Sequence, residues 1–168
     1  MSLIKKARNL ANGNMYNIFL VGLLILNVLP WLAPIFSSMG WKAPAKVIYT
    51  VYSFLCHQFA WRSLHVANHQ CAWCARDTFI WGSFFAIALI IKLYKVKAIK
   101  WYWIVPFVIP IALDGGIQTI AALVGFRDED PYYISTNTLR MVTGGTFGTG
   151  LGLWMLPSLK EMLDETKI

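Results

Sequence analysis

Four apolar stretches, separated by short polar segments, dominate the chain. They cover residues 15–36, 78–94, 101–125 and 138–156. Each is close to the ~20 residues that an α-helix needs to cross a bilayer. The first is too long for the apolar part of a cleaved signal peptide, so it is predicted to be a retained transmembrane helix. Pro30 and Pro34 are expected to bend or end this helix near its far side.

Residues 44–60 are ambiguous, because an apolar run follows Lys46 and closes on Cys56, His57 and Gln58. This segment fits either a short, partly inserted helix or a fifth span. The predicted fold class is all-α, a polytopic transmembrane helix bundle of four spans plus one short, partly inserted helix, with five spans as the alternative. The expected parts are a polar cytoplasmic leader (1–14), one membrane-embedded helical domain (15–157) and a polar cytoplasmic tail (158–168).

Composition supports a membrane protein. Hydrophobic residues make up 57% of the 168 residues and charged residues only 14%, whereas charged residues are roughly a quarter of an ordinary soluble domain. The net charge of +7 comes from basic residues in short loops beside apolar runs. This pattern is typical of membrane orientation, so we expect membrane lipids and not nucleic acid as partners, and leave an oligomer open.

The most basic loop predicts the orientation. It carries Lys92, Lys95, Lys97 and Lys100 and is assigned to the cytoplasm by the positive-inside tendency. The loops one span before and one span after it, residues 61–77 and the acidic residues 127–131, then face the other side. Five spans would place the basic leader outside, against the tendency, so four spans are favoured. We therefore expect a multi-pass protein of the cell membrane.

Residues 56–78 hold all three cysteines and all three histidines of the chain, and are predicted to lie at the non-cytoplasmic surface. Because two thiolates in C-x-x-C spacing can chelate one ion, a metal site is expected, with zinc as the ion and iron or no metal as the alternatives. Its predicted ligands are Cys56, His57, Cys71 and Cys74, and His65 or His69 can replace His57.

Two other interpretations of the cysteines remain open. Cys71 and Cys74 precede a predicted helix, whose positive end lowers a thiol pKa, so they can form a redox pair that Cys56 resolves. Alternatively, the thiols are buried, small apolar side chains and the histidines are interfacial.

Polar residues also occur inside the third and fourth apolar stretches. Asp114 and Gln118 are four residues apart and share one helix face, and Asn137 and Arg140 share another. An isolated charge in hydrocarbon costs at least ~3 kcal/mol, so Asp114 and Arg140 are expected to pair, either as a structural ion pair or as catalytic residues. The expected substrate-binding residues are Arg62, Arg76, Gln118 and Asn137. The spacing of Gly144, Gly148 and Gly152 is typical of close helix packing in membranes.

Several motifs in a fixed order resemble those of an uncharacterised family of predicted integral membrane proteins of bacteria and archaea. They are Cys56-His57-Gln58, Arg62-Ser63, Cys71-x-x-Cys74 with Arg76, Asp114-Gly115 with Gln118, and Ser135, Asn137, Arg140 and Thr143-Gly144. The resemblance covers roughly residues 47–152. It departs from the family pattern at Ala60, where a proline is usual, and at Trp73, where an arginine is usual. The family carries no known activity, so the resemblance implies a shared outward site without a reaction.

Three function classes follow from these residues. The first is a membrane metalloprotein acting on an anionic lipid or isoprenoid, in which the metal activates water or polarises an oxygen, arginines hold the anionic group and Asp114 acts as base. The second is a quinone-linked thiol-disulfide oxidoreductase that uses Cys71 and Cys74. A small oligomeric transporter is the third.

Overall fold

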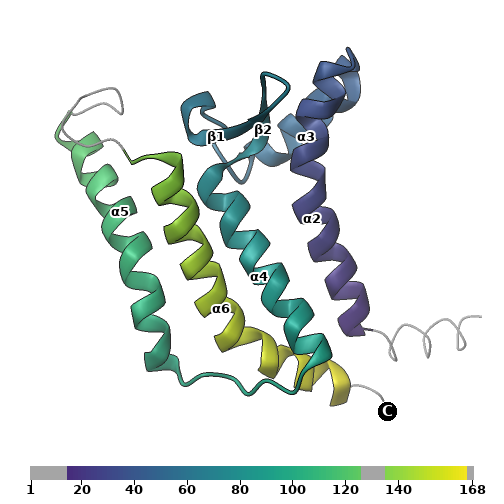
Figure 1. The fold of residues 1–168 in the computed structure, drawn as a ribbon, viewed down its shortest axis with the longest axis vertical. Helices are drawn as coiled ribbons and strands as arrows, with labels where there is room; N and C mark the ends of the chain where they lie inside the picture. The colour runs from purple at the N-terminus through teal and green to yellow at the C-terminus, as the bar shows by residue number, and fades with distance from the viewer. Residues whose placement is uncertain (1–14, 126–134, 166–168) are drawn as a thin grey trace, which may run out of the picture.

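Four long helices lie side by side in the computed structural model, which describes residues 15–125 and 135–165 (Figure 1). They are α2 (Met15–Ser38), α4 (Ala75–Leu93), α5 (Val105–Leu123) and α6 (Asn137–Glu165). Each predicted apolar stretch is thus helical. The predicted leader 1–14, the acidic loop 127–131 and residues 166–168 of the predicted tail lie outside the described residues.

The all-α prediction is corrected by a small antiparallel sheet. β1 (Ser63–Val66) pairs with β2 (His69–Cys74), and one 3₁₀ turn, η1 (Ala60–Arg62), precedes them. The two-residue turn between the strands has positive φ at both positions, 49° at Ala67 and 63° at Asn68, as a type I′ hairpin turn requires. Ala-Asn lacks the Asn-Gly signature of such turns, which explains why the sequence predicted only a loop here.

The hairpin and α3 (Lys42–Ser53) lie together at one end of the bundle, which we call the hairpin end (Figure 1). The connection from α4 to α5, which includes η2 (Trp101–Ile104), lies at the opposite end, which we call the lysine end. With 12 residues, α3 is about 18 Å long at 1.5 Å per residue. That is well short of a ~30 Å hydrocarbon layer, so α3 has the length of the predicted short helix and not of a fifth span.

Glycines bring α6 into close contact with α4 at the centre of the bundle. A Cβ at Gly144 or Gly148 would collide with the backbone of Arg76 or Ile80, and one at Gly152 would lie 3.0 Å from Ile87. The expectation that these glycines permit close helix packing is therefore confirmed.

Prolines inside α2 and α6 leave backbone carbonyls without a helical partner, and residues of other segments donate hydrogen bonds to these carbonyls. Because proline has no N–H, the carbonyl four residues earlier loses its helical partner. For Pro30 this is the carbonyl of Leu26, which accepts a hydrogen bond from the Tyr52 hydroxyl at 2.8 Å. For Pro157 in α6 it is the carbonyl of Leu153, which accepts a hydrogen bond from the Ile99 N–H at 3.2 Å. With its carbonyls satisfied in this way, α2 continues through both of its prolines to Ser38, so they do not end the helix.

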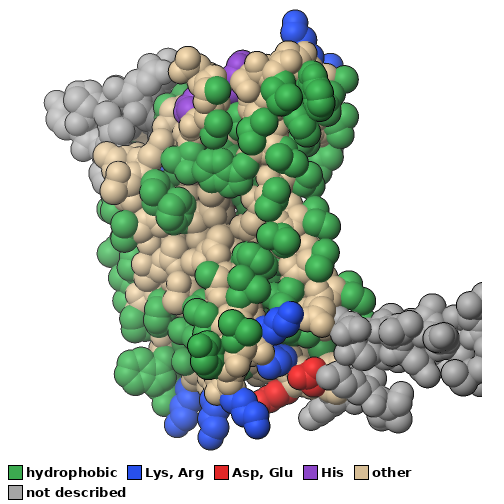
Figure 2. Space-filling view, turned by 45° about the vertical axis from the view of Figure 1, so that its right-hand side comes forward, with side chains coloured by type: hydrophobic (Ala, Val, Ile, Leu, Met, Phe, Trp, Pro, Cys, Tyr) green, Lys and Arg blue, Asp and Glu red, His purple; other side chains and the backbone are tan. Residues whose placement is uncertain are grey.

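Apolar side chains cover the outside of the helices. Large exposed examples include Val21 and Ile25 on α2 and Leu113 and Ile120 on α5, and apolar side chains cover the middle of the face in Figure 2. Within residues 15–125 and 135–165, two helical segments are long and apolar enough to cross a membrane, Met15–Ser38 with a mean hydropathy of 2.3 and Trp101–Ala121 with 1.6. Such a surface suits a lipid environment better than water.

Candidate functional site: a thiol and carboxylate cluster beside a cationic cavity

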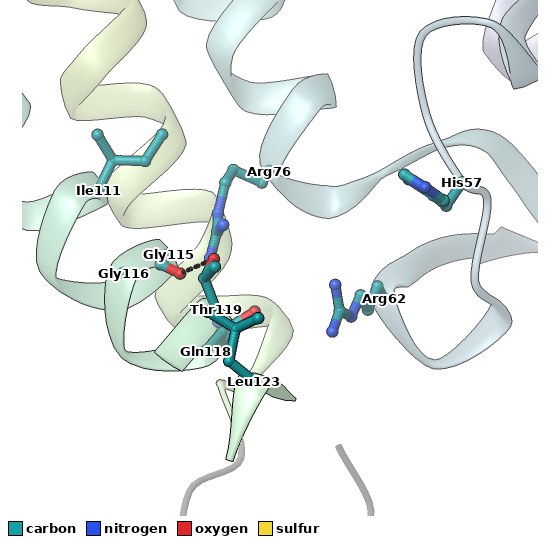
Figure 3. Close-up of a pocket in the computed structure, with 9 residues that line it drawn as sticks. All are labelled: His57, Arg62, Arg76, Ile111, Gly115, Gly116, Gln118, Thr119 and Leu123. Carbon is teal, nitrogen blue, oxygen red and sulfur yellow. Dashed lines mark hydrogen bonds between the residues drawn. The ribbon is translucent and has the colours of Figure 1, made fainter. Parts of the chain in front are cut away.

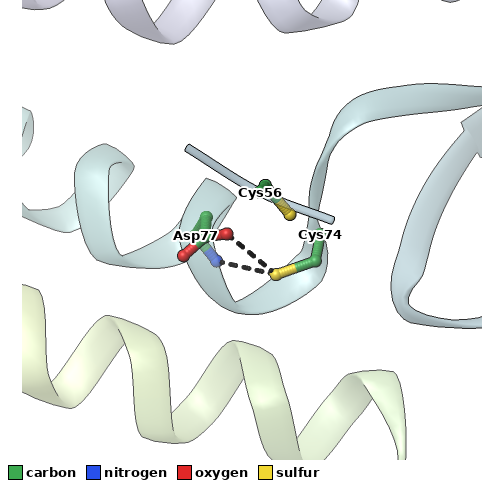
Figure 4. Close-up of side chains that lie close together, drawn as sticks. All are labelled: Cys56, Cys74 and Asp77. Atoms are coloured by element: carbon green, nitrogen blue, oxygen red, sulfur yellow. Dashed lines mark hydrogen bonds between the residues drawn. The ribbon is translucent and has the colours of Figure 1, made fainter. Parts of the chain in front are cut away.

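Cys56, Cys74 and Asp77 form a compact cluster at the hairpin end (Figure 4). One ligand atom from each, two Sγ and a carboxylate oxygen, lies within 4.8 Å of the other two. The Cys74 thiol donates to Asp77 Oδ2 at 3.1 Å, and the Cys74 sulfur accepts from the Asp77 N–H at 3.4 Å. The three side chains therefore offer a metal-type donor set, which we call the thiol–carboxylate cluster.

Secondary structure places two members of the cluster directly. Cys74 ends β2 and is also the N-cap of α4, and Asp77 lies in the first turn of that helix. An N-cap residue and the residue three positions later are neighbours in space, as in a capping box. The N-terminus of α4 therefore brings a thiol and a carboxylate together.

The third member, Cys56, is held by the turn that follows α3. Its N–H bonds the Tyr52 carbonyl at 3.0 Å. Gln58 adopts the left-handed conformation, with φ of 53°, which is uncommon for a residue with a Cβ. Its side chain donates to the Tyr49 carbonyl at 2.7 Å, and its own carbonyl accepts from Gln70 of β2 at 3.1 Å. These bonds hold the Cys56 turn against the hairpin.

The structure does not bring the four predicted metal ligands together. Cys71 and Cys74 are three residues apart in one strand, so their side chains point to opposite faces. The Cys71 thiol is fully buried and donates to the Pro30 carbonyl at 3.3 Å, the carbonyl that Pro34 leaves free. His57 stacks on Phe59 with a centroid separation of 5.7 Å. Both lie outside the thiol–carboxylate cluster, so their role as ligands remains only a prediction.

The two clustered thiols have different acidities. The pKa of Cys56 is lowered, chiefly by a side-chain hydrogen bond with Cys74. The pKa of Cys74 is raised by the same hydrogen bond, by burial and by the charge of Asp77. Burial raises the pKa of Cys71. Cys56 is therefore the thiol of the pair that ionises first.

A buried ion pair lies next to the cluster. Arg76, in the first turn of α4, pairs with Asp114 of α5, which is 4% exposed. Gln118 donates to the same carboxylate at 3.2 Å, so the predicted shared face of Asp114 and Gln118 is present.

Asn137 and Arg140 lie at the start of α6. Arg140 donates to Asn137 Oδ1 at 3.1 Å, and the Asn137 amide donates to the Ser63 carbonyl at 3.5 Å. These contacts join α6 to the hairpin. The pairing of Asp114 with Arg140 remains a prediction.

A cavity of about 800 Å³ opens beside the ion pair (Figure 3). His57 and Arg62 line it from the loop and η1, Arg76 from α4, and Gln118 from α5. Three of the predicted substrate-binding residues thus border one space. Asn137, the fourth, is not among the described residues that line it.

Asp77 is the member of the cluster that the sequence analysis missed. The available signal was its position three residues after Cys74 at a predicted helix start. That spacing matches a capping pair, but it is usually read as a helix signal and not as part of a metal site.

Comparison with known proteins places the chain among membrane proteins without an assigned activity. Residues 56–154 match the model of a family described as "Predicted membrane protein (DUF2085)". An uncharacterised protein of Methanocaldococcus jannaschii is 33% identical over 161 residues, which cover 88% of this chain and 94% of that protein. No solved structure matches the chain. The region matched by the family model contains the whole thiol–carboxylate cluster and the Arg76–Asp114 pair.

Proposed function

This chain belongs to the DUF2085 family of predicted membrane proteins, and from that premise we propose that it is a multi-pass zinc protein of the cell membrane. In this proposal Cys56, Cys74 and Asp77 hold the ion at the non-cytoplasmic face. The observation that carries the proposal is the convergence of three ligand atoms within 4.8 Å from a loop, a strand end and a helix turn. Cys74 and Asp77 are neighbours at the start of α4, so two separate segments converge here, that turn and the loop of Cys56.

The donor set suits zinc. Thiolate and carboxylate are both common zinc ligands, and structural zinc sites are almost always closed by four protein ligands. Catalytic zinc sites have three protein ligands and keep the fourth position for water or substrate. The three ligands proposed here correspond to the catalytic type, whose ion activates water or polarises an oxygen. Iron is the alternative ion.

Helix lengths and charge support the proposed membrane arrangement. The 19 residues of α4 extend about 28 Å, close to the thickness of a bilayer core. Lys92 lies in the last turn of α4 and Lys100 is the N-cap of η2. Basic residues therefore gather at the lysine end, opposite the histidines (Figure 2), and two further lysines, Lys42 and Lys46, lie on α3 at the other end. The positive-inside tendency assigns that end to the cytoplasm, and the cluster to the other side. We propose four spans, with α3 partly inserted.

An anionic lipid or isoprenoid is the substrate class that fits this placement. Arg76 lines the cavity and directly precedes the proposed ligand Asp77, so the first turn of α4 contributes to both the cavity and the cluster. Asp114 already accepts hydrogen bonds from Arg76 and Gln118. In our proposal it positions Arg76 and does not serve as the base that the sequence analysis assigned.

Cobalt substitution tests this proposal. Replacing the bound ion with Co²⁺ gives a visible spectrum that reports thiolate ligation and coordination number. We expect a tetrahedral thiolate spectrum that weakens in Cys56→Ser and Cys74→Ser, shifts in Asp77→Asn and is unchanged in Cys71→Ser. Added small anions should change the spectrum by entering the open position. A spectrum that depends on Cys71 would contradict the proposed ligands.

A second candidate function rests on the same two thiols. Cys56 and Cys74 are close together with free thiols, so a quinone-linked disulfide exchange would use this pair and not Cys71 with Cys74. Oxidation by a quinone would remove two electrons and two protons to form one S–S bond and a quinol. Mass spectrometry after alkylation, with and without added quinone, tests it: a loss of two alkylated cysteines, at Cys56 and Cys74, is the supporting result.

A further inference from the structure

The cavity beside the ion pair has a wall of basic and polar side chains. Arg62 approaches it from η1 and Arg76 from α4, and both guanidinium groups are drawn toward Gln118 and Thr119 of α5 in Figure 3. The described residues that line the cavity include no carboxylate. Asp114, outside the lining, neutralises one of the two arginines. Two guanidinium groups therefore border one cavity.

Arg76 keeps hydrogen-bonding capacity. One end of its guanidinium group is committed to Asp114. Its Nε is buried and has no hydrogen-bond partner within the described part of the chain. An unmet buried donor is costly. Because this Nε is shut off from the cavity, an anion there would contact the Nη end of the guanidinium group instead. Arginine is suited to this role, because its planar fork matches the oxygens of a phosphate group.

Two glycines of α5 shape the cavity. A Cβ at Gly115 would lie 3.3 Å from Arg76 Nη1, so glycine at this position leaves room for the guanidinium group. A Cβ at Gly116 would meet nothing within 4 Å, so this position borders open space. A large side chain placed at Gly116 would therefore occupy the cavity without displacing the helix.

The α5 side of the cavity also carries apolar residues, which continue onto the outside of that helix. Ile111 and Leu123 line the cavity, and the neighbouring Ile117 and Ile120 are 45% and 63% exposed. The cavity thus joins a basic pocket to an apolar helix face. A free anion would use only the first of these surfaces, whereas an amphiphile would use both.

The position of the cavity along the bundle fits a lipid headgroup. Arg76 is the second residue of α4, and Gln118 is five residues from the end of α5, or about 8 Å along the helix. Both therefore lie near the hairpin end of the bundle, at the level where lipid headgroups meet the hydrocarbon layer.

We propose that this cavity binds the phosphate-bearing headgroup of an amphiphilic molecule, with the headgroup between Arg62 and Arg76 and the apolar chain along α5. The inference rests on the proposed placement of the hairpin end at the membrane surface, and it deepens the proposed function by assigning the substrate class to named residues. It does not depend on the zinc ion.

A binding experiment separates the sources of the phosphate group. Protein in detergent micelles is titrated with farnesyl diphosphate, with inorganic pyrophosphate, and with farnesol as the uncharged chain. We expect saturable binding of farnesyl diphosphate, binding of pyrophosphate at least about tenfold weaker, a difference of about 1.4 kcal/mol, and no saturable binding of farnesol. Equal affinity for pyrophosphate, or equal affinity for farnesol, would overturn the assignment to a phosphate-bearing amphiphile.

Variants test whether the amphiphile binds in this cavity. Gly116→Trp should abolish binding by filling the cavity. Gly22→Trp is the matched control, because Gly22 is also a helical glycine with nothing within 4 Å of a Cβ but lies on α2, and it should bind like the wild type. Arg62→Gln should weaken binding at least tenfold while farnesol remains unbound. Unchanged binding in Gly116→Trp would contradict the proposed cavity.

The zinc proposal can fail separately. Binding is repeated after chelation and in Cys56→Ser. Retained binding without metal supports the cavity as an independent site, even if the zinc centre proves wrong. Binding that disappears with the metal would contradict the inference that the arginines hold the headgroup.

Discussion

At the residue scale, Cys71 and Cys74 show how one motif serves two purposes. Their sequence spacing suggests a chelating pair, but a strand places them on opposite faces. Cys74 joins Cys56 and Asp77, whereas Cys71 bonds the Pro30 carbonyl inside the fold. The sequence could predict that these cysteines mark the site, because they stand out in an apolar chain. It could not predict which thiols converge, because that depends on the hairpin.

The ion pair of Arg76 and Asp114 makes a prediction at the same scale. Asp114→Asn should lower stability by about 3–5 kcal/mol, because it leaves a largely buried guanidinium group without its counter-charge. Arg76→Gln should have a similar effect. The double variant should be less destabilised than the sum of the two, by about 1–3 kcal/mol. Apparent melting temperatures in detergent measure this, and strictly additive effects would contradict a direct ion pair.

At the element scale, backbone carbonyls that lack a hydrogen-bond partner within their own helix join the helices to other segments. Prolines in α2 and α6 free backbone carbonyls, and donors from α3, β2 and the lysine-end connection bond them. The apolar pattern predicted the helices well, because their length and composition are local properties. It left open whether the prolines would bend or end α2, and the helix continues to Ser38, because the donors that satisfy the freed carbonyls come from distant residues such as Tyr52.

Tyr52 tests this account. Tyr52→Phe should destabilise the protein by about 1–3 kcal/mol, because the Leu26 carbonyl is left without a partner. In a Pro30→Ala background the same change should cost distinctly less, since residue 30 then supplies an N–H to that carbonyl. Melting temperatures of the wild type, the two single variants and the double variant complete this double-mutant cycle. An equal loss in both backgrounds would show that the hydroxyl acts in some other way.

The glycines of α6 give a second prediction for an element. Gly148→Ala should destabilise the bundle by about 1–3 kcal/mol, because the new methyl group would meet the α4 backbone at Ile80 and overpack the interface. Gly145→Ala is the matched control, since its Cβ would make only an ordinary 3.8 Å contact with Phe79. Its stability should change little or increase slightly. Similar losses in both variants would argue against direct contact of α4 and α6 at Gly148.

At the scale of the whole molecule, the chain has two chemically different ends. The hairpin end carries the cluster and the cavity, and the lysine end carries the basic connection. The sequence predicted this division, because one apolar stretch, residues 78–94, separates the cysteine segment from the loop that carries Lys95, Lys97 and Lys100. It could not predict that α4 and α6 form the central pair, which depends on where the glycines face.

Labelling in intact cells tests the orientation. His69→Cys, at the start of β2, and Lys97→Cys, in the connection after α4, both replace exposed residues. A membrane-impermeant maleimide added outside should label the first variant and not the second, and permeabilised cells should be labelled in both. Wild-type protein gives the background from its own cysteines. Labelling of Lys97→Cys in intact cells would reverse the proposed orientation.

Zinc content in cysteine variants tests the central claim most directly. Elemental analysis of protein purified in detergent without chelator should find about one zinc per chain in the wild type and in Cys71→Ser, whose hydroxyl can still donate to the Pro30 carbonyl. Cys56→Ser and Cys74→Ser should lose the ion while keeping a cooperative melting transition. Zinc that persists in Cys56→Ser, or that disappears in Cys71→Ser, would contradict the thiol–carboxylate cluster as the metal site.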